Sequence, residues 1–215
     1  MPDPTDLAAL RRDYESDGID VDQLPDEPLT LWQSWLRDAE AADVAEINAM
    51  IVSTVDADGT PSSRTVLCKA ATEAGFVFFT NYTSRKGRAI AAEPRISLLF
   101  PWHPLSRQVI VIGRAEQVPR EESEAYFASR PRGSQISAVA SAQSSVVVSR
   151  NVLEQRVAEL ERTYDGRDVP CPPHWGGFLV RPQTVEFWQG RQDRLHDRIR
   201  YLAQGNGWQV ERLSP

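Results

Sequence analysis

The chain has 215 residues, of which 41% are hydrophobic and 25% charged, as in an ordinary globular protein. Its 30 acidic and 24 basic residues argue against a nucleic-acid-binding protein but leave room for a local basic pocket. The two cysteines and three histidines show no metal-ligand spacing, so neither a metal site nor a disulfide scaffold is expected. With no signal peptide and no long apolar run, the sequence predicts a cytoplasmic protein without a membrane partner.

The predicted elements begin after an acidic, weakly apolar stretch over residues 1–28, which we interpret as a mobile arm. A single domain is expected over 29–215, opening with an amphipathic helix from Leu31 that Thr30 would cap. The runs 50–55 and 63–69 flank a turn that contains Gly59 and predict a β-hairpin. Further strands are predicted over 76–80, 96–100, 108–112, 178–180, 185–188 and 208–213.

Helical signals lie between these strands, over 84–92, 119–129 and 150–164. The early strands follow one another with short links, unlike a regular alternation of strand and helix. The expected fold is therefore mainly β, an antiparallel barrel with helices packed outside it.

Three segments place Arg or Lys where a phosphate could bind. On a straight strand Arg64 and Lys69 would point to opposite faces, so they would serve different ligands unless a bulge intervenes. Arg85 and Lys86 lie where a strand gives way to a helix, and free N–H groups at a helix start attract anions. Each segment alone is also explained without a ligand, by solvated strand residues or by capping of the helix.

The third segment runs from Tyr126 to Ser134, around the end of one helix and the start of the next. Tyr126 and Arg130 are four residues apart and share a helix face, and Ser134 would cap the following helix. These groups could converge on one phosphate, or they could form a loop of solvated arginines. Further on, Arg194, His196 and Arg198 would share one face if this stretch is extended.

In order and spacing, these segments resemble the pyridoxine/pyridoxamine 5′-phosphate oxidase family of FMN-binding split barrels. The resemblance runs from the Arg11–Tyr14 stretch to the last residue. Its most specific part is Phe187-Trp188-Gln189-Gly190 followed by Arg194-Leu195-His196-Asp197-Arg198. Other matching stretches are Phe79–Lys86, Phe100–Trp102, Arg107–Val109, Ser129–Arg132, Gln143–Ser145 and Trp175–Gly177.

The resemblance implies a homodimer that binds FMN at its interface. It assigns cofactor contacts to Arg64, Thr65, Val66, Leu67, Cys68, Lys69, Phe79, Thr80, Arg85, Lys86, Gln108, Gln143, Ser144, Trp188 and Arg198. It assigns substrate contacts to Arg11, Tyr14, Lys69, Tyr126, Arg130, Ser134, Arg194 and His196, and the last two would be catalytic.

The implied reaction oxidises pyridoxine or pyridoxamine 5′-phosphate to pyridoxal 5′-phosphate, with O2 as acceptor and release of H2O2. The chain departs from the family's usual pattern at Phe79, where a Tyr is frequent, and at Glu46-Ile47, where Asp-Pro is common. Two alternatives remain open from the sequence: another split-barrel flavin reductase, and a non-catalytic protein that binds FMN or pyridoxal phosphate.

Overall fold

The computed structural model describes residue 14, residue 16 and residues 18–215, and these form two compact units. The larger unit comprises Asn48–Leu99 and Val111–Gln183. The smaller unit comprises the described residues up to Ile47, together with Phe100–Ile110 and Thr184–Pro215. Three strands, β5 (Arg95–Trp102), β6 (Arg107–Gln117) and β7 (Trp175–Gln189), contribute residues to both units.

The sheet of the larger unit begins with the expected hairpin of β1 (Ala49–Val55) and β2 (Pro61–Leu67). Met50, Val52 and Thr54 alternate into the core, as the period of two requires. Gly59 takes the positive φ of +87° at which a side chain would strain the turn. Strand β2 ends at Leu67, two residues before the expected end, and the Lys69 N–H donates to the Val77 carbonyl at 2.8 Å instead of to the hairpin partner.

The remaining strands give the order β2-β1-β5-β6-β7-β4-β3, with β3 at Ala70–Thr72 and β4 at Gly75–Asn81. Strand β3 was not predicted, since three residues carry no readable alternation. The two strands expected over 178–180 and 185–188 are one continuous strand, β7. The strand runs through Pro182, although proline has no N–H group to donate to a neighbouring strand.

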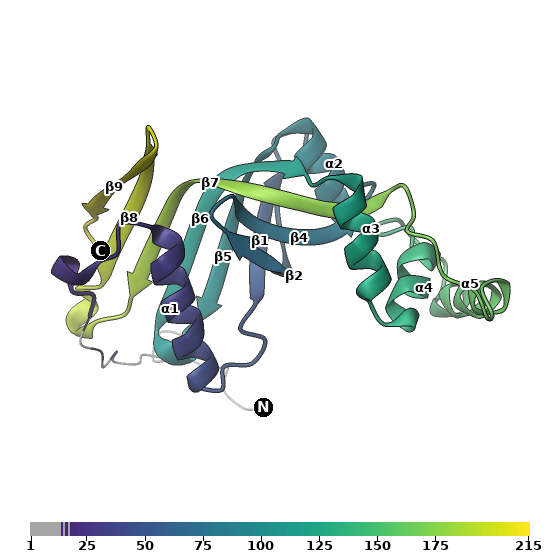
Figure 1. Cartoon of the computed structure of the whole chain (residues 1–215), viewed down its shortest axis with the longest axis horizontal. Coiled ribbons are helices and arrows are strands. Elements are labelled where there is room, and N and C mark those ends of the chain that lie inside the picture. Colours follow the sequence, from purple (N-terminus) through teal and green to yellow (C-terminus); the bar gives the residue numbers. More distant parts are fainter. Residues whose placement is uncertain (1–13, 15, 17) are drawn as a thin grey trace, which may run out of the picture. The chain divides into compact units, whose positions relative to one another are not determined.

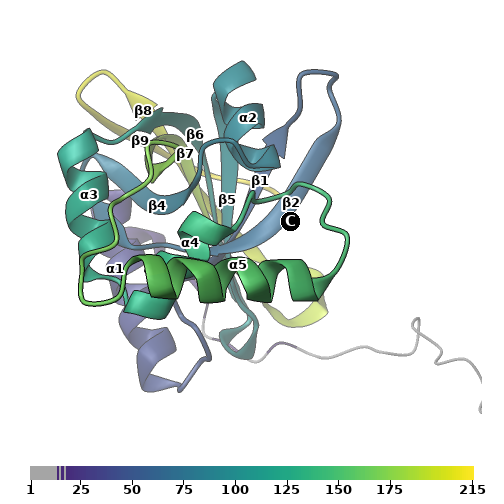
Figure 2. The same cartoon turned by 90° about the vertical axis from the view of Figure 1, so that its right-hand side faces the viewer.

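Four helices belong to the larger unit: α2 (Arg85–Ala92), α3 (Arg120–Ser129), α4 (Arg132–Ala140) and α5 (Arg150–Thr163). Ser84 caps α2 by accepting the Gly87 N–H at 3.2 Å. Helix α4 begins at Arg132 with Pro131 at its N-cap, so the expectation that Ser134 caps it is wrong. Helices α4 and α5 lie side by side (Figures 1 and 2) and pack around Phe127, Ile136 and Trp175.

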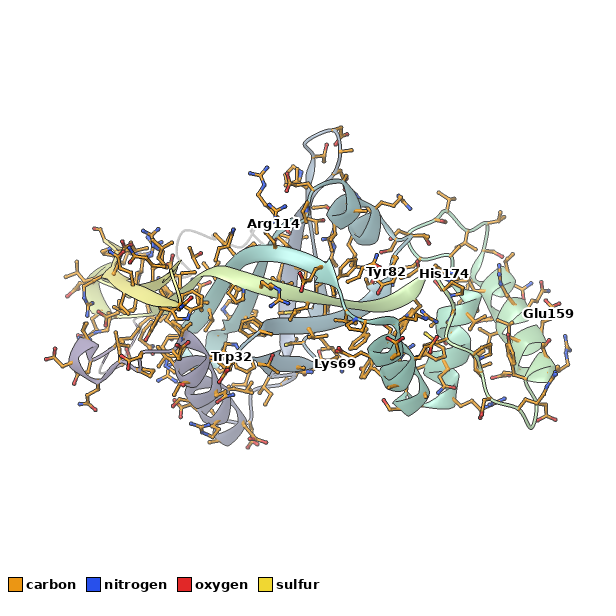
Figure 3. All side chains as sticks on the ribbon, turned by 45° about the horizontal axis from the view of Figure 1, so that its top comes forward. Trp32, Lys69, Tyr82, Arg114, Glu159 and His174 are labelled. Atoms are coloured by element: carbon orange, nitrogen blue, oxygen red, sulfur yellow. The ribbon has the colours of Figure 1, made fainter. Side chains whose placement is uncertain are left out.

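The start of β7 is tied to the end of β4 within the larger unit. Tyr82 and His174, both labelled in Figure 3, lie together there, and the Tyr82 N–H donates to the His174 carbonyl at 2.7 Å. The Tyr82 hydroxyl donates to the Gly177 carbonyl at 3.0 Å, and a Cβ on Gly176 would come within 2.2 Å of that hydroxyl. A side chain at position 176 would therefore displace the Tyr82 hydroxyl from this bond.

The smaller unit holds α1 (Pro28–Ala41), β8 (Asp197–Gln204) and β9 (Gly207–Arg212), with β8 paired to residues 184–189 of β7. Helix α1 starts at Pro28 rather than at Leu31, since proline suits the first turn of a helix. Its buried Trp32 and Trp35 pack edge-on against Phe100 and Phe187, with ring centroids 5.3 Å and 5.1 Å apart. Among the described residues, no helix has both the length and the apolar character needed to cross a bilayer.

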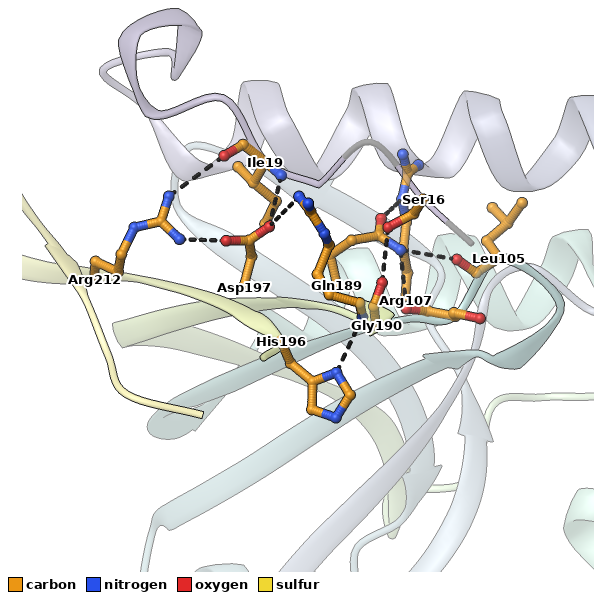
Figure 4. Close-up of polar contacts among 11 residues, drawn as sticks. Ser16, Ile19, Leu105, Arg107, Gln189, Gly190, His196, Asp197 and Arg212 are labelled. Carbon is orange, nitrogen blue, oxygen red and sulfur yellow. Dashed lines mark hydrogen bonds and ion pairs between the residues drawn. The ribbon is translucent and has the colours of Figure 1, made fainter. Parts of the chain in front are cut away.

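Asp197 joins three segments of the smaller unit (Figure 4). Its carboxylate accepts the Ile19 N–H at 3.0 Å and pairs with Arg191 at 3.3 Å and with Arg212. Burial opposes ionisation here, but the Ile19 bond and the two arginines leave the pKa of Asp197 below its usual value. The charged carboxylate therefore stabilises the contact of the segment around Ile19 with β8 and β9.

Candidate active site

A cavity of about 520 Å³ opens in the larger unit, between the end of β2, the strand β4 and the helices α3 and α4. Its lining is rich in polar side chains and in groups expected from the sequence. The expected residues that line it are Thr65, Val66, Leu67, Lys69, Phe79, Thr80, Lys86, Tyr126, Arg130, Ser134 and Gln143. Residues far apart in the chain thus converge on one space.

Arg130 reaches this cavity without a carboxylate partner among the described residues. Its guanidinium lies over the Trp175 ring, 4.7 Å from the centroid, and over Phe127 at 5.6 Å. Its Nη1 is buried and has no hydrogen-bond partner, and burial lowers the pKa of the group. Buried donors are normally satisfied. A guanidinium with a free buried N–H group therefore suits an anionic ligand.

Lys86 is a second cation of the cavity, and it is buried, with only 8% of its surface exposed. Its Nζ donates to the Thr80 hydroxyl at 3.1 Å and to the Gln143 side-chain oxygen at 3.2 Å. In the part of the chain that the structure describes, no carboxylate lies within ion-pair distance of it. Burial first, and then the charge of Arg64, lower the pKa of Lys86 to about 8.

Arg64 and Arg85 lie in the same unit but do not line the cavity. Arg64 donates to the Val52 carbonyl at 3.0 Å and to the Thr54 hydroxyl at 2.9 Å. Arg85 pairs with Asp56 at 2.6 Å. Lys69, labelled in Figure 3, does line the cavity. Arg64 and Lys69 therefore do not share the cavity, as expected. Strand alternation alone does not explain this difference, because β2 ends at Leu67, before Lys69.

Three aromatic rings form one wall of the cavity. Phe79 stacks on Tyr126 with centroids 3.9 Å apart, and on Trp175 at 5.5 Å with an angle of 13° between the planes. Trp175 lies in a stretch that matches the family, but the resemblance assigns it no role. Also missed were Asn81, Gly133, Ser137, Ala138 and Ser141. Ser137, Ala138 and Ser141 are three, four and seven residues after Ser134, a helical spacing that could have revealed them.

Other expected residues of the larger unit lie outside the cavity lining. Cys68 is buried, its thiol donates to the Ala70 carbonyl, and burial raises its pKa to about 11. Ser144 is exposed and adopts a positive φ of 70°.

The remaining expected residues belong to the smaller unit, where Tyr14, Trp188 and His196 form an aromatic cluster. The His196 ring centroid is 4.8 Å from that of Trp188 and 5.5 Å from that of Tyr14. His196 Nδ1 accepts the Arg191 N–H at 3.0 Å, as Figure 4 shows. Burial and the charge of Arg194 lower the pKa of His196. Arg11 lies outside the described residues.

Arg194 and Arg198 are not placed as an extended stretch would place them. Residues Gln192–Arg194 form a 3-10 turn in which Arg194 is exposed, with a φ of 62°, and β8 starts only at Asp197. The expected common face of Arg194, His196 and Arg198 is therefore wrong. Arg198 instead pairs with Glu186 at 2.7 Å, which raises its pKa. Gln108, also in this unit, is half-buried on β6.

The sequence matches a known family over most of its length. Residues 36–164 match the family described as pyridoxamine 5′-phosphate oxidase. The chain belongs to this family. Residues 175–215 match a second family, described as the C-terminal dimerisation region of pyridoxine 5′-phosphate oxidase.

Individual relatives agree with this assignment. The pyridoxine/pyridoxamine 5′-phosphate oxidase of Streptomyces avermitilis is 55% identical, over 98% of this chain and 96% of its own length. The enzyme of the same name from Rubrobacter xylanophilus is 53% identical, over 98% of this chain and 97% of its own. Among solved structures, PhzG from Burkholderia lata, in complex with tetrahydrophenazine-1-carboxylic acid, superposes with a TM-score of 0.87. It is 34% identical and covers 93% of this chain and 98% of its own, so the split-barrel expectation is confirmed.

Proposed function

We propose that the protein is an FMN-dependent oxidase that converts pyridoxine 5′-phosphate or pyridoxamine 5′-phosphate to pyridoxal 5′-phosphate. One observation carries the proposal: Lys86 is buried and Arg130 is half-buried in the lining of one cavity, and no described carboxylate pairs with either. An unpaired buried charge is costly, so such a site is built for anionic ligands. A phosphorylated substrate and a phosphorylated cofactor supply two anions.

The donor set around Lys86 fits the phosphate of FMN. Lys86, Thr80 and Gln143 would hold it with the backbone of 65–67, and Arg64 and Arg85 would add positive charge nearby. When bound, FMN would supply the redox chemistry, namely hydride acceptance from the substrate and transfer of the electrons to O2. The protein's own part is to bind and orient the two ligands and to manage protons.

The donor set around Arg130 fits the phosphate of the substrate. We assign Lys69, Tyr126, Arg130 and Ser134 to this grip, and the aromatic wall of Phe79, Tyr126 and Trp175 borders it. Binding the phosphate, remote from the reacting carbon, orients that carbon without changing its chemistry.

We assign Arg194 and His196 to the pyridine ring of the substrate, with Tyr14 and Arg11 as further contacts. Because His196 Nδ1 accepts the Arg191 N–H, the neutral imidazole carries its own proton on Nε2. Nε2 is therefore the atom that can donate to a ligand. The lowered pKa favours the neutral ring, in which Nδ1 accepts the Arg191 bond.

The match to a C-terminal dimerisation region supports a homodimer, and we propose that FMN binds at its interface. Trp188, Arg198 and Gln108 are the cofactor contacts assigned to the smaller unit. Arg198 would then share its guanidinium between Glu186 and the cofactor. The cytoplasmic location expected from the sequence remains a prediction.

An oxygen-electrode assay tests the function with FMN-loaded protein and each of the two phosphorylated vitamers. We expect equal molar amounts of O2 consumed, H2O2 formed and pyridoxal 5′-phosphate formed, with ammonia released from the amine alone. Protein that binds FMN but consumes no O2 with either vitamer would be a binding protein. Oxidation of tetrahydrophenazine-1-carboxylic acid, the compound bound in the Burkholderia structure, without oxidation of either vitamer would contradict the proposed substrate.

A further inference from the structure

Arg120, which has no assigned role in the site above, bonds the loop that leads into β7. Its Nη2 donates to the Cys171 carbonyl at 2.7 Å, and its Nη1 donates to the carbonyls of Pro172 at 3.1 Å and Trp175 at 3.0 Å. Its Nε donates to Glu124 at 2.8 Å. Four of the five N–H groups of the guanidinium thus have a partner, and three of those partners are backbone carbonyls of one short loop.

This position is an unfavourable one for a cation. Arg120 is the first residue of α3, and positive charge is disfavoured at the N-terminal end of a helix. Arg150 offers a direct comparison, because it is the first residue of α5 and its Nε also donates to the glutamate four residues on, at 2.7 Å. Arg150 makes no bond to a loop carbonyl among the described residues. The carbonyl bonds therefore distinguish Arg120 from an ordinary surface pair.

The loop that Arg120 bonds carries the ring on which Arg130 lies. Trp175 is 6% exposed. Its backbone N–H donates to the Pro172 carbonyl at 3.0 Å, and its backbone carbonyl accepts a hydrogen bond from Arg120. The indole stacks on Phe79, and the Arg130 guanidinium lies 4.7 Å from its centroid. A shift of the loop would move this ring, and Arg130 would lose its support within the cavity.

We propose that Arg120 is a positioning residue for the substrate phosphate, acting through the 171–175 loop and Trp175 on Arg130. The inference rests on the proposed function, since it assigns the phosphate of the vitamer to Arg130. It does not place Arg120 in contact with the substrate or the cofactor. Its effect should therefore appear in substrate binding and leave cofactor binding and the chemical step alone.

The test compares Arg120→Met, Arg120→Lys and the matched control Arg150→Met, each as FMN-loaded full-length protein. For Arg120→Met we expect the KM for pyridoxamine 5′-phosphate to rise about tenfold, a loss of about 1.4 kcal/mol of binding. Its kcat and FMN affinity should stay within about twofold of wild type. Arg120→Lys keeps the charge but not the planar fork and should lie between wild type and Arg120→Met. Arg150→Met should match wild type.

An unchanged KM in Arg120→Met would overturn the proposal, and so would equal losses in KM, kcat and FMN affinity, which would indicate general loosening. If Arg120→Met does not fold, the same comparison of KM, kcat and FMN affinity is made with Arg120→Lys, and the same outcomes would overturn the proposal. If wild type oxidises neither vitamer, the proposed function fails on its own. Arg120 is then tested by equilibrium dialysis of pyridoxal 5′-phosphate, where Arg120→Met should bind about tenfold more weakly than Arg150→Met.

Discussion

The cavity of the larger unit and the C-terminal strands of the smaller unit both contain several basic residues, but they treat the charge differently. On the strands, Arg198 pairs with Glu186, Arg200 with Glu211, and Arg212 with Asp197. In the cavity, Lys86 and Arg130 have no such partner among the described residues. The first arrangement joins strands to one another. The second leaves positive charge for a ligand.

The two arrangements differ in their effect on the free energy of folding. A buried charge without a partner is costly, whereas a paired charge has little net effect on stability. The paired arginines are also partly exposed, with 33% to 47% of their side-chain surface accessible, so each pair contributes little. The unpaired cations of the cavity therefore stand out as ligand-binding groups, and their variants should behave in the opposite way to variants of Arg200 and Arg212, which have no assigned ligand.

The largest effect is expected from Arg130→Met, which keeps much of the side-chain volume over Trp175 but removes the charge. Hydrogen bonds to charged groups contribute about 1.5–3 kcal/mol, so the KM for the phosphorylated vitamer should rise by about 10- to 100-fold. The melting temperature should not fall, because a half-buried charge without a carboxylate partner is lost. Steady-state kinetics and a thermal scan measure both effects.

Arg200→Met is the matched control from the paired group, because Arg200 bonds Glu211 across β8 and β9. We expect its KM to equal that of wild type, with stability lowered by at most about 1 kcal/mol. A KM for Arg130→Met within about twofold of that of Arg200→Met would remove Arg130 from the phosphate site.

The sequence anticipated which segments converge on the cavity, but not which cations are paired. Segments were identified from local signals, such as the helix start at Ser84 and the Tyr126 to Arg130 spacing. Pairing depends on non-local register, as when Trp188 of β7 aligns with Arg198 of β8 and Glu186 comes within reach. The turn at Arg194 was missed for a related reason, since alternation assumes a strand that begins only at Asp197.

The second effect concerns stability, through Asp197→Asn. The carboxylate is 12% exposed and binds Ile19, Arg191 and Arg212, so its neutralisation should lower the free energy of unfolding by about 2 kcal/mol at neutral pH. Because the folded pKa is lowered, this contribution is present above the unfolded pKa and is lost as pH falls through the folded one. Urea unfolding at neutral and strongly acid pH should therefore show the difference vanish in acid, whereas an equal loss at both would contradict it.

The third effect is a pH dependence of flavin binding that arises from Lys86. Its pKa of about 8 means that the flavin-free protein loses this charge as pH rises through that value. The phosphate of FMN stays doubly charged there, since its second pKa is about 6. FMN affinity, measured by quenching of flavin fluorescence, should thus weaken above about pH 8, by at most about tenfold per pH unit.

Lys86→Arg separates this effect from general alkaline loosening, because a guanidinium keeps its charge throughout. Its FMN affinity should not change with pH over the same range. The free energy of unfolding of the ligand-free protein should change in the opposite direction and rise with pH. The folded pKa is about 8 and the ordinary one 10.5, so the unfolded chain binds more protons between them and stability rises with pH. An FMN affinity for wild type that is flat across this window would exclude Lys86 from the phosphate site.

The smallest effect is expected from Asp56→Asn, which removes the carboxylate partner of Arg85, a residue assigned to the cofactor. Asp56 and Arg85 are 24% and 50% exposed, so the pair resembles the strand arginines rather than Lys86. Removing this carboxylate frees Arg85 for a phosphate and removes a repulsive charge, which should strengthen FMN binding by about two- to fivefold at low salt. The gain should disappear at about 1 M salt, because the Debye length there is only about 3 Å and charges on the surface are screened from one another. Weaker FMN binding in Asp56→Asn would mean instead that Asp56 orients Arg85 toward the cofactor.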